Sequence, residues 1–204
     1  MKEHDYPGRF IVIEGADGAG TTTQAEKLAD KHGFYLTEEP TENKVGEKVK
    51  QMISEDDYQP SSVALGFASD RMVHIDEEIK IKLREGKTVI CDRYYHSSLV
   101  YQPTMGLEFE WVKKLNRFAL KPDLTFILDI EPDLGMKRIH QREEGKDENI
   151  FEDLDFQEKV VLKYRKLDEK LDEDIEIIDS TQSKEKVHQN IEEALEKNFE
   201  NINI

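Results

Sequence analysis

Residues 11–24 read IVIEGADGAGTTTQ, a short apolar run followed by three glycines and the start of a helical pattern. Glycine adopts backbone torsions that other residues avoid, so successive N–H groups in such a loop can turn inward around a phosphate. A helix that begins directly after the loop adds the positive end of its dipole. The stretch therefore predicts a phosphate-binding loop between a buried strand and a helix.

The loop departs from the common P-loop pattern G-x-x-x-x-G-K-[ST] at one position. Gly15 and Gly20 take the two glycine positions and Thr22 supplies a hydroxyl for Mg²⁺, but Thr21 stands where lysine is expected. That lysine normally offsets charge on the β- and γ-phosphates of ATP. Three interpretations remain open: another cation replaces the lysine, the chain binds nucleotides as a regulatory protein with weakened catalysis, or the turn binds no ligand.

The rest of the chain predicts one α/β domain over residues 1–204. Short β-rich runs alternate with longer stretches of helical period, which is typical of a parallel sheet covered by helices on both faces. A densely charged segment without an apolar face is expected to be a mobile lid, at about residues 142–155, and the tail at 197–204 is expected to fray. The expected strands are 10–14, 35–38, 88–92, 124–129 and 176–179, and the expected helices include 24–31, 61–85, 156–171 and 187–195.

Composition narrows the class of protein. The 204 residues carry a formal charge of −16, which disfavours nucleic acid and anionic membranes as partners. Neither a signal peptide nor an apolar run of membrane-spanning length is evident. Cys91 is the only cysteine, so no intrachain disulfide can form and a reducing, cytoplasmic compartment is expected. The acidic surplus fits ordinary solubility or a salty interior equally well.

The strand expected at 88–92 ends in Asp92, which Arg93 follows. Ligands gather at the carboxyl ends of parallel strands, so Asp92 is a candidate to organise Mg²⁺ together with Thr22. Arg93 is a candidate to bind a second phosphate through paired hydrogen bonds. The alternative is an Asp-Arg ion pair that closes a strand.

Several further stretches appear in a fixed order, and together with the loop they resemble the thymidylate kinase family over nearly the whole chain. They are residues 37–41 (TEEPT), 67–71 (FASDR), 92–94 (DRY), 97–98 (SS), 101–102 (YQ), 122–124 (PDL) and 153–156 (DLDF). The resemblance implies a P-loop NTPase fold, transfer of the γ-phosphate of ATP to dTMP with Mg²⁺, and a homodimer. A related deoxynucleotide or deoxynucleoside kinase is the nearest alternative.

The resemblance also implies roles for single residues. Asp17 corresponds to the carboxylate that binds the deoxyribose 3′-hydroxyl, Phe67 to the ring that stacks on thymine and Arg71 to the donor to the base. Phe67 and Arg71 lie four apart, as residues on one helix face do, although a phenylalanine in such a helix is more often core. The residues predicted to bind dTMP are Asp17, Phe67, Arg71, Arg93, Ser98, Tyr101 and Gln102, with Tyr101 selecting deoxyribose.

The residues implied to bind ATP are Gly15, Ala16, Asp17, Gly18, Ala19, Gly20, Thr21, Thr22 and Arg138. Gly18 occupies the position of a P-loop arginine in some members of the family, so the lid is expected to supply the missing cation. Arg142 is the candidate, as a catalytic residue beside Asp92 and Arg93, although Arg138 and Arg142 also fit a solvated helix face. Glu38 replaces an arginine common in the family, so binding of the acceptor phosphate is expected to depend more on Arg93.

Overall fold

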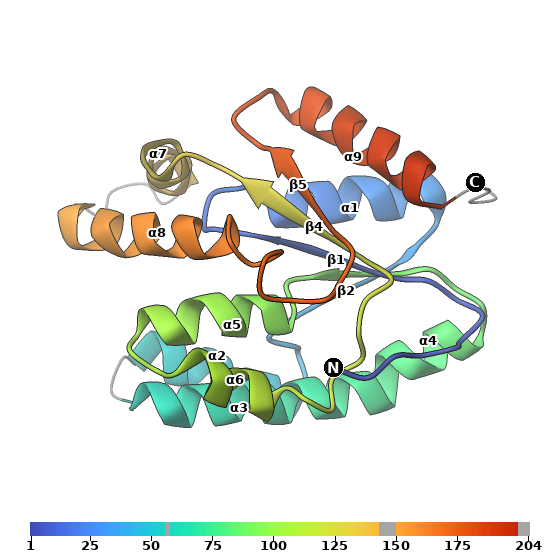
Figure 1. Cartoon of the computed structure of the whole chain (residues 1–204), viewed down its shortest axis with the longest axis horizontal. Helices are drawn as coiled ribbons and strands as arrows, with labels where there is room; N and C mark the ends of the chain where they lie inside the picture. The colour runs from blue at the N-terminus through green and yellow to red at the C-terminus, as the bar shows by residue number, and fades with distance from the viewer. Residues whose placement is uncertain (56–57, 143–149, 200–204) are drawn as a thin grey trace.

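The protein is described here by a computed structural model that covers residues 1–55, 58–142 and 150–199, apart from the side chains of residues 142 and 150–153. Helices lie on both faces of a single sheet (Figure 1). The elements in chain order are β1 Phe10–Gly15, α1 Thr21–His32, β2 Tyr35–Glu38, α2 Lys44–Glu55, α3 Pro60–His74, the π-helix η1 Ile75–Ile79, α4 Lys80–Arg84, β3 Val89–Asp92, α5 Tyr95–Thr104, α6 Phe109–Leu115, β4 Leu124–Asp129, α7 Pro132–Arg142, α8 Ile150–Tyr164, β5 Ile175–Asp179 and α9 Lys184–Asn198.

The sheet has five parallel strands in the spatial order β2-β3-β1-β4-β5. This confirms the predicted fold class, and each observed strand ends within one residue of its predicted bounds. β1 lies in the centre, with Ile13 opposite Asp92 of β3 and Gly15 opposite Leu128 of β4. The phosphate-loop candidate therefore leaves the sheet between the ends of β3 and β4, where ligands of open α/β sheets bind.

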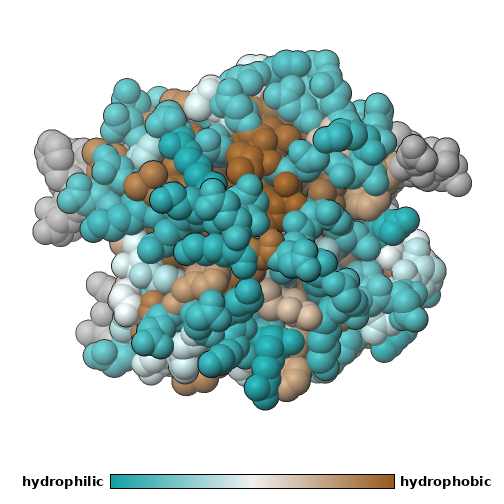
Figure 2. Space-filling view, viewed as in Figure 1, coloured by the Kyte–Doolittle hydropathy of each residue, from teal (hydrophilic) through white to brown (hydrophobic). Residues whose placement is uncertain are grey.

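The surface reflects the charged composition. Figure 2 shows a face covered mostly by hydrophilic side chains, with a narrow band of hydrophobic residues between them. Among the described residues, no helix combines the length and the apolar character needed to cross a bilayer.

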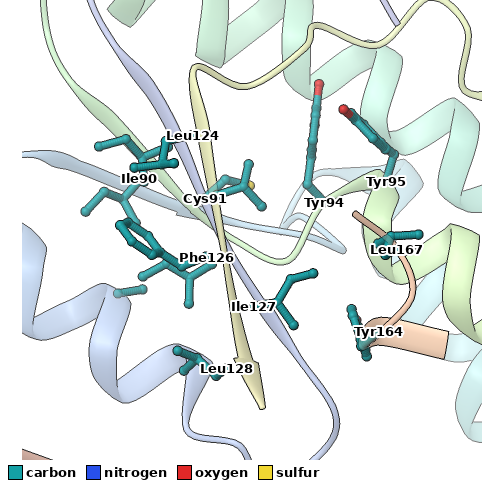
Figure 3. Packing of buried hydrophobic residues seen from close by; sticks show 14 of the residues in the cluster. Ile90, Cys91, Tyr94, Tyr95, Leu124, Phe126, Ile127, Leu128, Tyr164 and Leu167 are labelled. Carbon is teal, nitrogen blue, oxygen red and sulfur yellow. The ribbon is translucent and has the colours of Figure 1, made fainter. Parts of the chain in front are cut away.

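The core lies on both sides of the central strands. Along β4, Phe126 and Leu128 point to one face of the sheet and Ile127 points to the other, where Tyr94 and Tyr164 lie (Figure 3). This alternation follows from the two-residue period of a strand. α1 and α9 cover the first face, and α5 and α8 cover the second (Figure 1).

The long helix predicted over residues 61–85 is present but interrupted. It begins at Pro60, a residue favoured in the first turn, and continues as α3, the π-helical turn η1 and α4. Ile75, Ile79 and Leu83 keep one buried stripe through the irregular turn. The sequence does not mark this turn, because the same apolar spacing fits an unbroken α-helix.

The prediction of a loop over residues 143–155 was partly wrong, because α8 already begins at Ile150. Leu154, Gln157 and Val161 lie three and four residues apart, so the helical face extends one turn further back than the sequence analysis recognised. Residues 143–149, which make up half of the predicted lid, lie outside the described residues, as do 200–204 of the predicted tail. The helix predicted over residues 156–171 also ends earlier than expected, because α8 ends at Tyr164. The predicted helices did not include α2, α5, α6 or α7.

Candidate active site

The glycine-rich loop is a tight connection between β1 and α1. Gly18 and Gly20 have φ angles of 79° and 94°, which only glycine adopts without strain, and the Ala19 N–H donates to the Ala16 carbonyl at 3.1 Å. α1 begins at Thr21, directly after the loop. The predicted geometry, a strand followed by glycines and a helix N-terminus, is therefore present.

Gly18 also lies in close contact with α7. A Cβ atom on Gly18 would approach the Gly135 carbonyl oxygen to 2.3 Å, and one on Gly135 would approach the Asp17 carbonyl oxygen to 2.8 Å. Both distances are shorter than van der Waals contact. The backbone of α7 thus occupies the space that any side chain at position 18 would need, which explains why this loop carries glycine there.

Thr22 and Asp92 meet at the end of β3, as predicted. The Thr22 hydroxyl donates to Asp92 Oδ2 at 2.5 Å, and Asp92 Oδ1 is buried without a partner among the described residues. A hydroxyl and an unpaired carboxylate oxygen are ligands suited to Mg²⁺, which often takes one or two protein ligands and completes its shell with water and phosphate. The described residues contain no cluster of three or more His, Cys, Asp or Glu side chains that would form an all-protein metal site.

Two guanidinium groups reach the loop from neighbouring elements. Arg93 Nη1 donates to the Gly15 carbonyl at 3.1 Å, and Arg138 Nη1 donates to the Gly18 carbonyl at 3.3 Å. Thr21 is almost fully buried, and its methyl carbon faces Gly15. Arg142 ends α7, but its side chain lies outside the described residues, so its catalytic role stays a prediction.

Arg93 lies between the loop and the acceptor side of the site. Its Nη2 donates to Asp17 Oδ1 at 2.7 Å, and its Nη1 lies 3.4 Å from the Tyr101 hydroxyl. Its φ angle of 65° is the one left-handed value among the described non-glycine residues. Burial alone would lower the pKa of Arg93, but nearby carboxylates, with Asp17 the larger contributor and Glu14 the smaller, help raise it well above the usual value, so the group stays charged.

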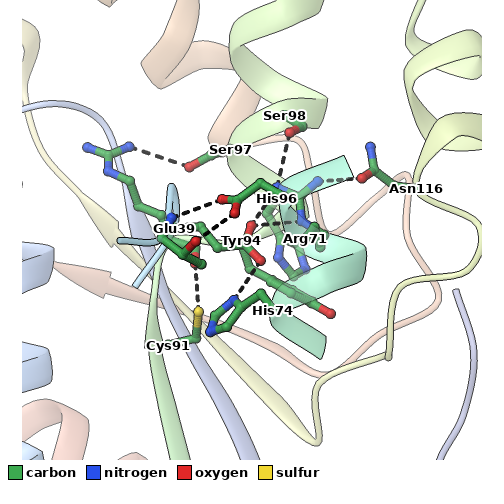
Figure 4. Close-up of polar contacts among 12 residues, drawn as sticks. Glu39, Arg71, His74, Cys91, Tyr94, His96, Ser97, Ser98 and Asn116 are labelled. Carbon is green, nitrogen blue, oxygen red and sulfur yellow. Dashed lines mark hydrogen bonds and ion pairs between the residues drawn. The ribbon is translucent and has the colours of Figure 1, made fainter. Parts of the chain in front are cut away.

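Arg71 is fully buried in a polar network (Figure 4). Nε and Nη2 pair with Glu39 Oε2 at 2.8 and 2.7 Å, Nη2 also donates to Ser98 at 3.3 Å, and Nη1 donates to Asn116. Three of the five N–H groups of arginine therefore donate hydrogen bonds, one from each nitrogen, and Nη2 is also in ion-pair contact with Glu39. On Nη1 a second N–H has no partner among the described residues and is available to a ligand.

One cavity of about 390 Å³ brings the predicted acceptor residues together. Its volume falls in the usual range for small-ligand sites. All seven residues predicted to bind dTMP line it, namely Asp17, Phe67, Arg71, Arg93, Ser98, Tyr101 and Gln102. Gln102 Oε1 is buried there without a partner among the described residues, and burial raises the pKa of Tyr101, so that hydroxyl is neutral.

α8 closes one side of this cavity, which the sequence analysis did not foresee. Phe156 lines the cavity with its ring centroid 6.2 Å from that of Tyr101, and Gln157 Nε2 donates to Asp17 Oδ2 at 3.0 Å. The sequence offered one signal for Gln157 as a site residue, namely that it is a polar residue on the otherwise apolar face of α8. Glu39 stood in a quoted motif without an assigned role, and Asn116 gave no signal. Glu38, by contrast, faces outward and pairs with Lys50 at 3.7 Å.

A second cavity of about 210 Å³ lies on the other side of the loop. Gly18, Gly20 and Arg138 line it, together with Ser180 and Lys184 from the end of β5 and the start of α9. Arg138 Nη2 donates to the Ser180 carbonyl at 3.0 Å, and Ser180 Oγ donates to the Ala19 carbonyl at 2.5 Å. Ser180 and Lys184 were missed, although residues that follow a strand at this sheet edge are candidates on general grounds.

The family pattern described as Thymidylate kinase matches residues 13–191 of the chain. A "Probable thymidylate kinase" of Thermococcus kodakarensis is 41% identical over 197 residues, which cover 89% of this chain and 94% of that protein. The proteins of the same name from Methanocaldococcus jannaschii and Pyrococcus horikoshii are 39% identical over 187 residues and 40% identical over 195. These alignments cover 89% and 90% of this chain, and 93% and 94% of the relatives. Since the match spans nearly the whole length on both sides and includes both cavities, the chain belongs to the thymidylate kinase family.

Proposed function

We propose that this chain transfers the γ-phosphate of ATP to dTMP and releases ADP and dTDP. The observation that carries the proposal is the single cavity lined by all seven predicted acceptor residues, directly beside the glycine-rich loop. Asp17 belongs to both, because it lies in the loop and lines the cavity. A donor phosphate bound by the loop would therefore lie next to an acceptor bound in the cavity.

In this proposal the chain acts by positioning and charge neutralisation. Loop N–H groups and the N-terminus of α1 bind the donor phosphates, and Arg93 binds the acceptor phosphate. Thr22 and Asp92 would hold Mg²⁺, which supplies charge neutralisation between the phosphates when bound. Placing both substrates in line without a covalent enzyme intermediate is the main catalytic contribution of the protein.

Base and sugar recognition follow from the cavity wall. Phe67 offers a ring for stacking, and Arg71 offers an N–H of Nη1 that its buried partners leave unused. Gln102 Oε1 and Ser98 add polar groups at the same wall, and Tyr101 lies beside Arg93, where it would exclude a 2′-hydroxyl. The Asp17 carboxylate accepts a hydrogen bond from the 3′-hydroxyl of the deoxyribose.

The charge of the absent lysine is supplied, in this proposal, by arginines of α7. Arg138 lies at the loop, and Arg142 follows one turn later in the same helix. Arg142→Ala is expected to lower kcat, with Lys137→Ala as a control for loss of a cation from the same helix. Phosphoryl transfer unchanged in Arg142→Ala would remove that residue from the mechanism.

We further propose a cytoplasmic homodimer. Leu65 on α3 and Ile53 on α2 are each about half exposed, 52% and 50%, which suits helix packing between two copies. The proposed compartment rests on the cysteine count: Cys91 is the only cysteine, so the chain has no intrachain disulfide that would call for an oxidising environment. Light scattering of the purified chain tests the dimer.

The deciding experiment measures ADP formation with Mg²⁺-ATP and dTMP, dUMP, dCMP, dGMP, UMP or thymidine as acceptor. Turnover that prefers dTMP supports the proposal, and turnover that prefers another acceptor points to a related kinase. Tight nucleotide binding without turnover, restored by Thr21→Lys, would instead indicate the regulatory protein that the absent lysine suggests.

A further inference from the structure

A fully buried carboxylate lies beneath the acceptor site without contacting the cavity. Glu14 is in β1, one residue before the glycine-rich loop, and its side chain is 0% exposed. It accepts four hydrogen bonds: from the Tyr94 N–H at 2.7 Å, the Ser97 N–H at 3.1 Å, Ser97 Oγ at 2.7 Å and the Tyr164 hydroxyl at 2.9 Å. A charged residue in a central buried strand is retained only where such partners satisfy it.

Two of these bonds cap α5 from a distant strand. Tyr94 is the N-cap residue of α5, and its own side chain makes no capping bond. Glu14 Oε1 instead binds the N–H groups of Tyr94 and Ser97, the two groups that a capping box satisfies. The carboxylate also complements the positive end of the helix dipole.

Arg93 immediately precedes this capped turn, and its backbone is fixed on both sides by β1. Its own N–H donates to the Ile13 carbonyl at 2.9 Å, and the next N–H, that of Tyr94, donates to Glu14. Between these bonds Arg93 adopts the left-handed φ of 65°. Such conformations persist only where surrounding contacts over-determine them, and they gather at functional sites.

A second route joins Glu14 to the Arg93 guanidinium through a side chain. Ser97 Oγ donates to Glu14 Oε2 and lies 3.4 Å from Arg93 Nη1, at the long end of hydrogen-bond distances. The Tyr164 hydroxyl, from the end of α8, donates to the same carboxylate oxygen. Glu14 thus connects the loop strand, the acceptor helix α5 and the helix that closes the cavity.

We propose that Glu14 is a positioning residue, whose carboxylate caps α5 and thereby holds Arg93 in the conformation that directs its guanidinium to the acceptor phosphate. Glu14 reaches neither cavity, so it acts on the substrate only through Arg93 and α5. The inference rests on the proposed function, since it assigns the acceptor phosphate to Arg93.

The test compares Glu14→Gln with Glu173→Gln. The amide introduced by Glu14→Gln keeps one oxygen for the two backbone N–H groups but loses the charge and the second acceptor. Glu173 serves as the control, because its side chain is also buried and binds Tyr95 and His96 in α5 but contacts neither Arg93 nor the N-cap. A link to Glu14 runs through His96, whose Nδ1 lies 3.8 Å from Glu14 Oε1, beyond hydrogen-bond distance. Circular dichroism at the assay temperature confirms that each variant is folded.

Glu14→Gln is expected to raise the KM for dTMP and lower kcat, together reducing kcat/KM for dTMP by roughly 10- to 100-fold, because small misplacements of a binding group cost on this order. The KM for ATP should stay within about twofold of the wild type in both variants, as should the KM for dTMP in Glu173→Gln. A merely structural role would lower activity without this split between the two substrates. The affinity for dTMP, measured by calorimetry without ATP, should fall in parallel.

Three results would overturn the inference. The first is a wild-type KM for dTMP in Glu14→Gln. The second is a loss of kcat/KM for dTMP in Glu173→Gln as large as that in Glu14→Gln, and the third is a rise in the KM for ATP of Glu14→Gln as large as the rise in its KM for dTMP. If Glu14→Gln does not fold, Ser97→Ala, which removes the side-chain route, carries the test, and an unchanged KM for dTMP there would overturn the inference. A wild-type chain that neither binds nor phosphorylates dTMP overturns the proposed function as well, whereas an active wild type with an insensitive Glu14→Gln overturns the inference alone.

Discussion

The buried ion pair between Glu39 and Arg71 gives the clearest quantitative expectation. Both side chains are nearly inaccessible, at 2% and 1% exposure, and Arg71 Nε and Nη2 both bind Glu39 Oε2. The other carboxylate oxygen faces His74 Nδ1 at 3.1 Å. Glu39→Gln keeps the shape of the side chain and one acceptor oxygen but removes the negative charge, so Arg71 remains buried without a counter-ion.

Removing one partner of a buried ion pair destabilises a protein by about 3–5 kcal/mol, because the remaining charge has lost its compensation. For a chain of this length each kcal/mol shifts the melting temperature by about 2–4 °C. Glu39→Gln should therefore lower the melting temperature by roughly 6–20 °C. Because the same change frees Arg71 to move from the cavity wall, the KM for dTMP should rise as well.

The neighbouring residue supplies the control. Glu38 pairs with Lys50 at 3.7 Å, and these side chains are 54% and 37% exposed. Exposed pairs contribute about 0–1 kcal/mol, so Glu38→Gln should change the stability little. Urea denaturation of both variants, followed by circular dichroism, measures the difference. A loss below about 1 kcal/mol in Glu39→Gln would mean that the pair is screened like a surface pair, and the reasoning from burial would be wrong.

Three further expectations follow from single sites. Gly18→Ala should destabilise the protein more than Gly20→Ala. Both residues have positive φ, which costs either variant roughly 1–3 kcal/mol of backbone strain, but only the Cβ added at position 18 would meet the α7 backbone, at 2.3 Å. The difference between the melting temperatures of the two variants therefore measures the clash. Asp92→Asn keeps a side chain that can accept a hydrogen bond but loses the negative charge. It should lower kcat by about 10²–10³-fold, as loss of an electrostatic stabiliser does, and should raise the Mg²⁺ concentration needed for the half-maximal rate. An unchanged Mg²⁺ titration would contradict the role of Asp92. Burial is the largest single influence on the pKa of Glu173 and raises it, but the hydrogen bonds from His96 and Tyr95 and the nearby positive charge together lower the net pKa below 4.5. This carboxylate therefore stabilises the fold above about pH 4.5, and the contribution is lost as the pH falls below that value. Acid unfolding of Glu173→Gln should lack this component, and identical curves would argue against it.

The sheet and the phosphate loop could be predicted from the sequence, because both depend on the order of residues that are close together in the chain. Residues 10–13 are apolar at consecutive positions, as a strand buried on both faces requires, and the glycines mark the turn that follows. Phe67 and Arg71 came from the resemblance to the family, and their spacing of four residues shows only that the two can share one helix face. The family's ordered motifs supplied the rest of the acceptor list.

The contacts that organise the site were harder to predict, because they join residues far apart in the chain. Glu14 and Tyr164 are 150 positions apart, and Asp17 and Gln157 are 140 apart. No periodicity in the sequence encodes such pairs. One signal was available, however: Glu14 is a charged residue inside a run that otherwise predicts a buried strand, and burial of a carboxylate requires several donors nearby.

The structure also narrows the question of what replaces the P-loop lysine. Of the two guanidinium groups that reach the loop, Arg93 is neutralised by Asp17 at 2.7 Å, whereas the described partners of Arg138 are uncharged, namely the Gly18 carbonyl and the hydroxyl and carbonyl of Ser180. Arg138 therefore remains a proposed substitute for the lysine, because none of its described hydrogen-bond partners carries a negative charge. The contact between Gly18 and α7 fixes that helix against the loop one turn before Arg138, so the cation is held on a neighbouring helix rather than on α1. Fixed charges near a developing phosphate charge act most strongly when they need no rearrangement, and an arginine anchored to the loop backbone meets that condition.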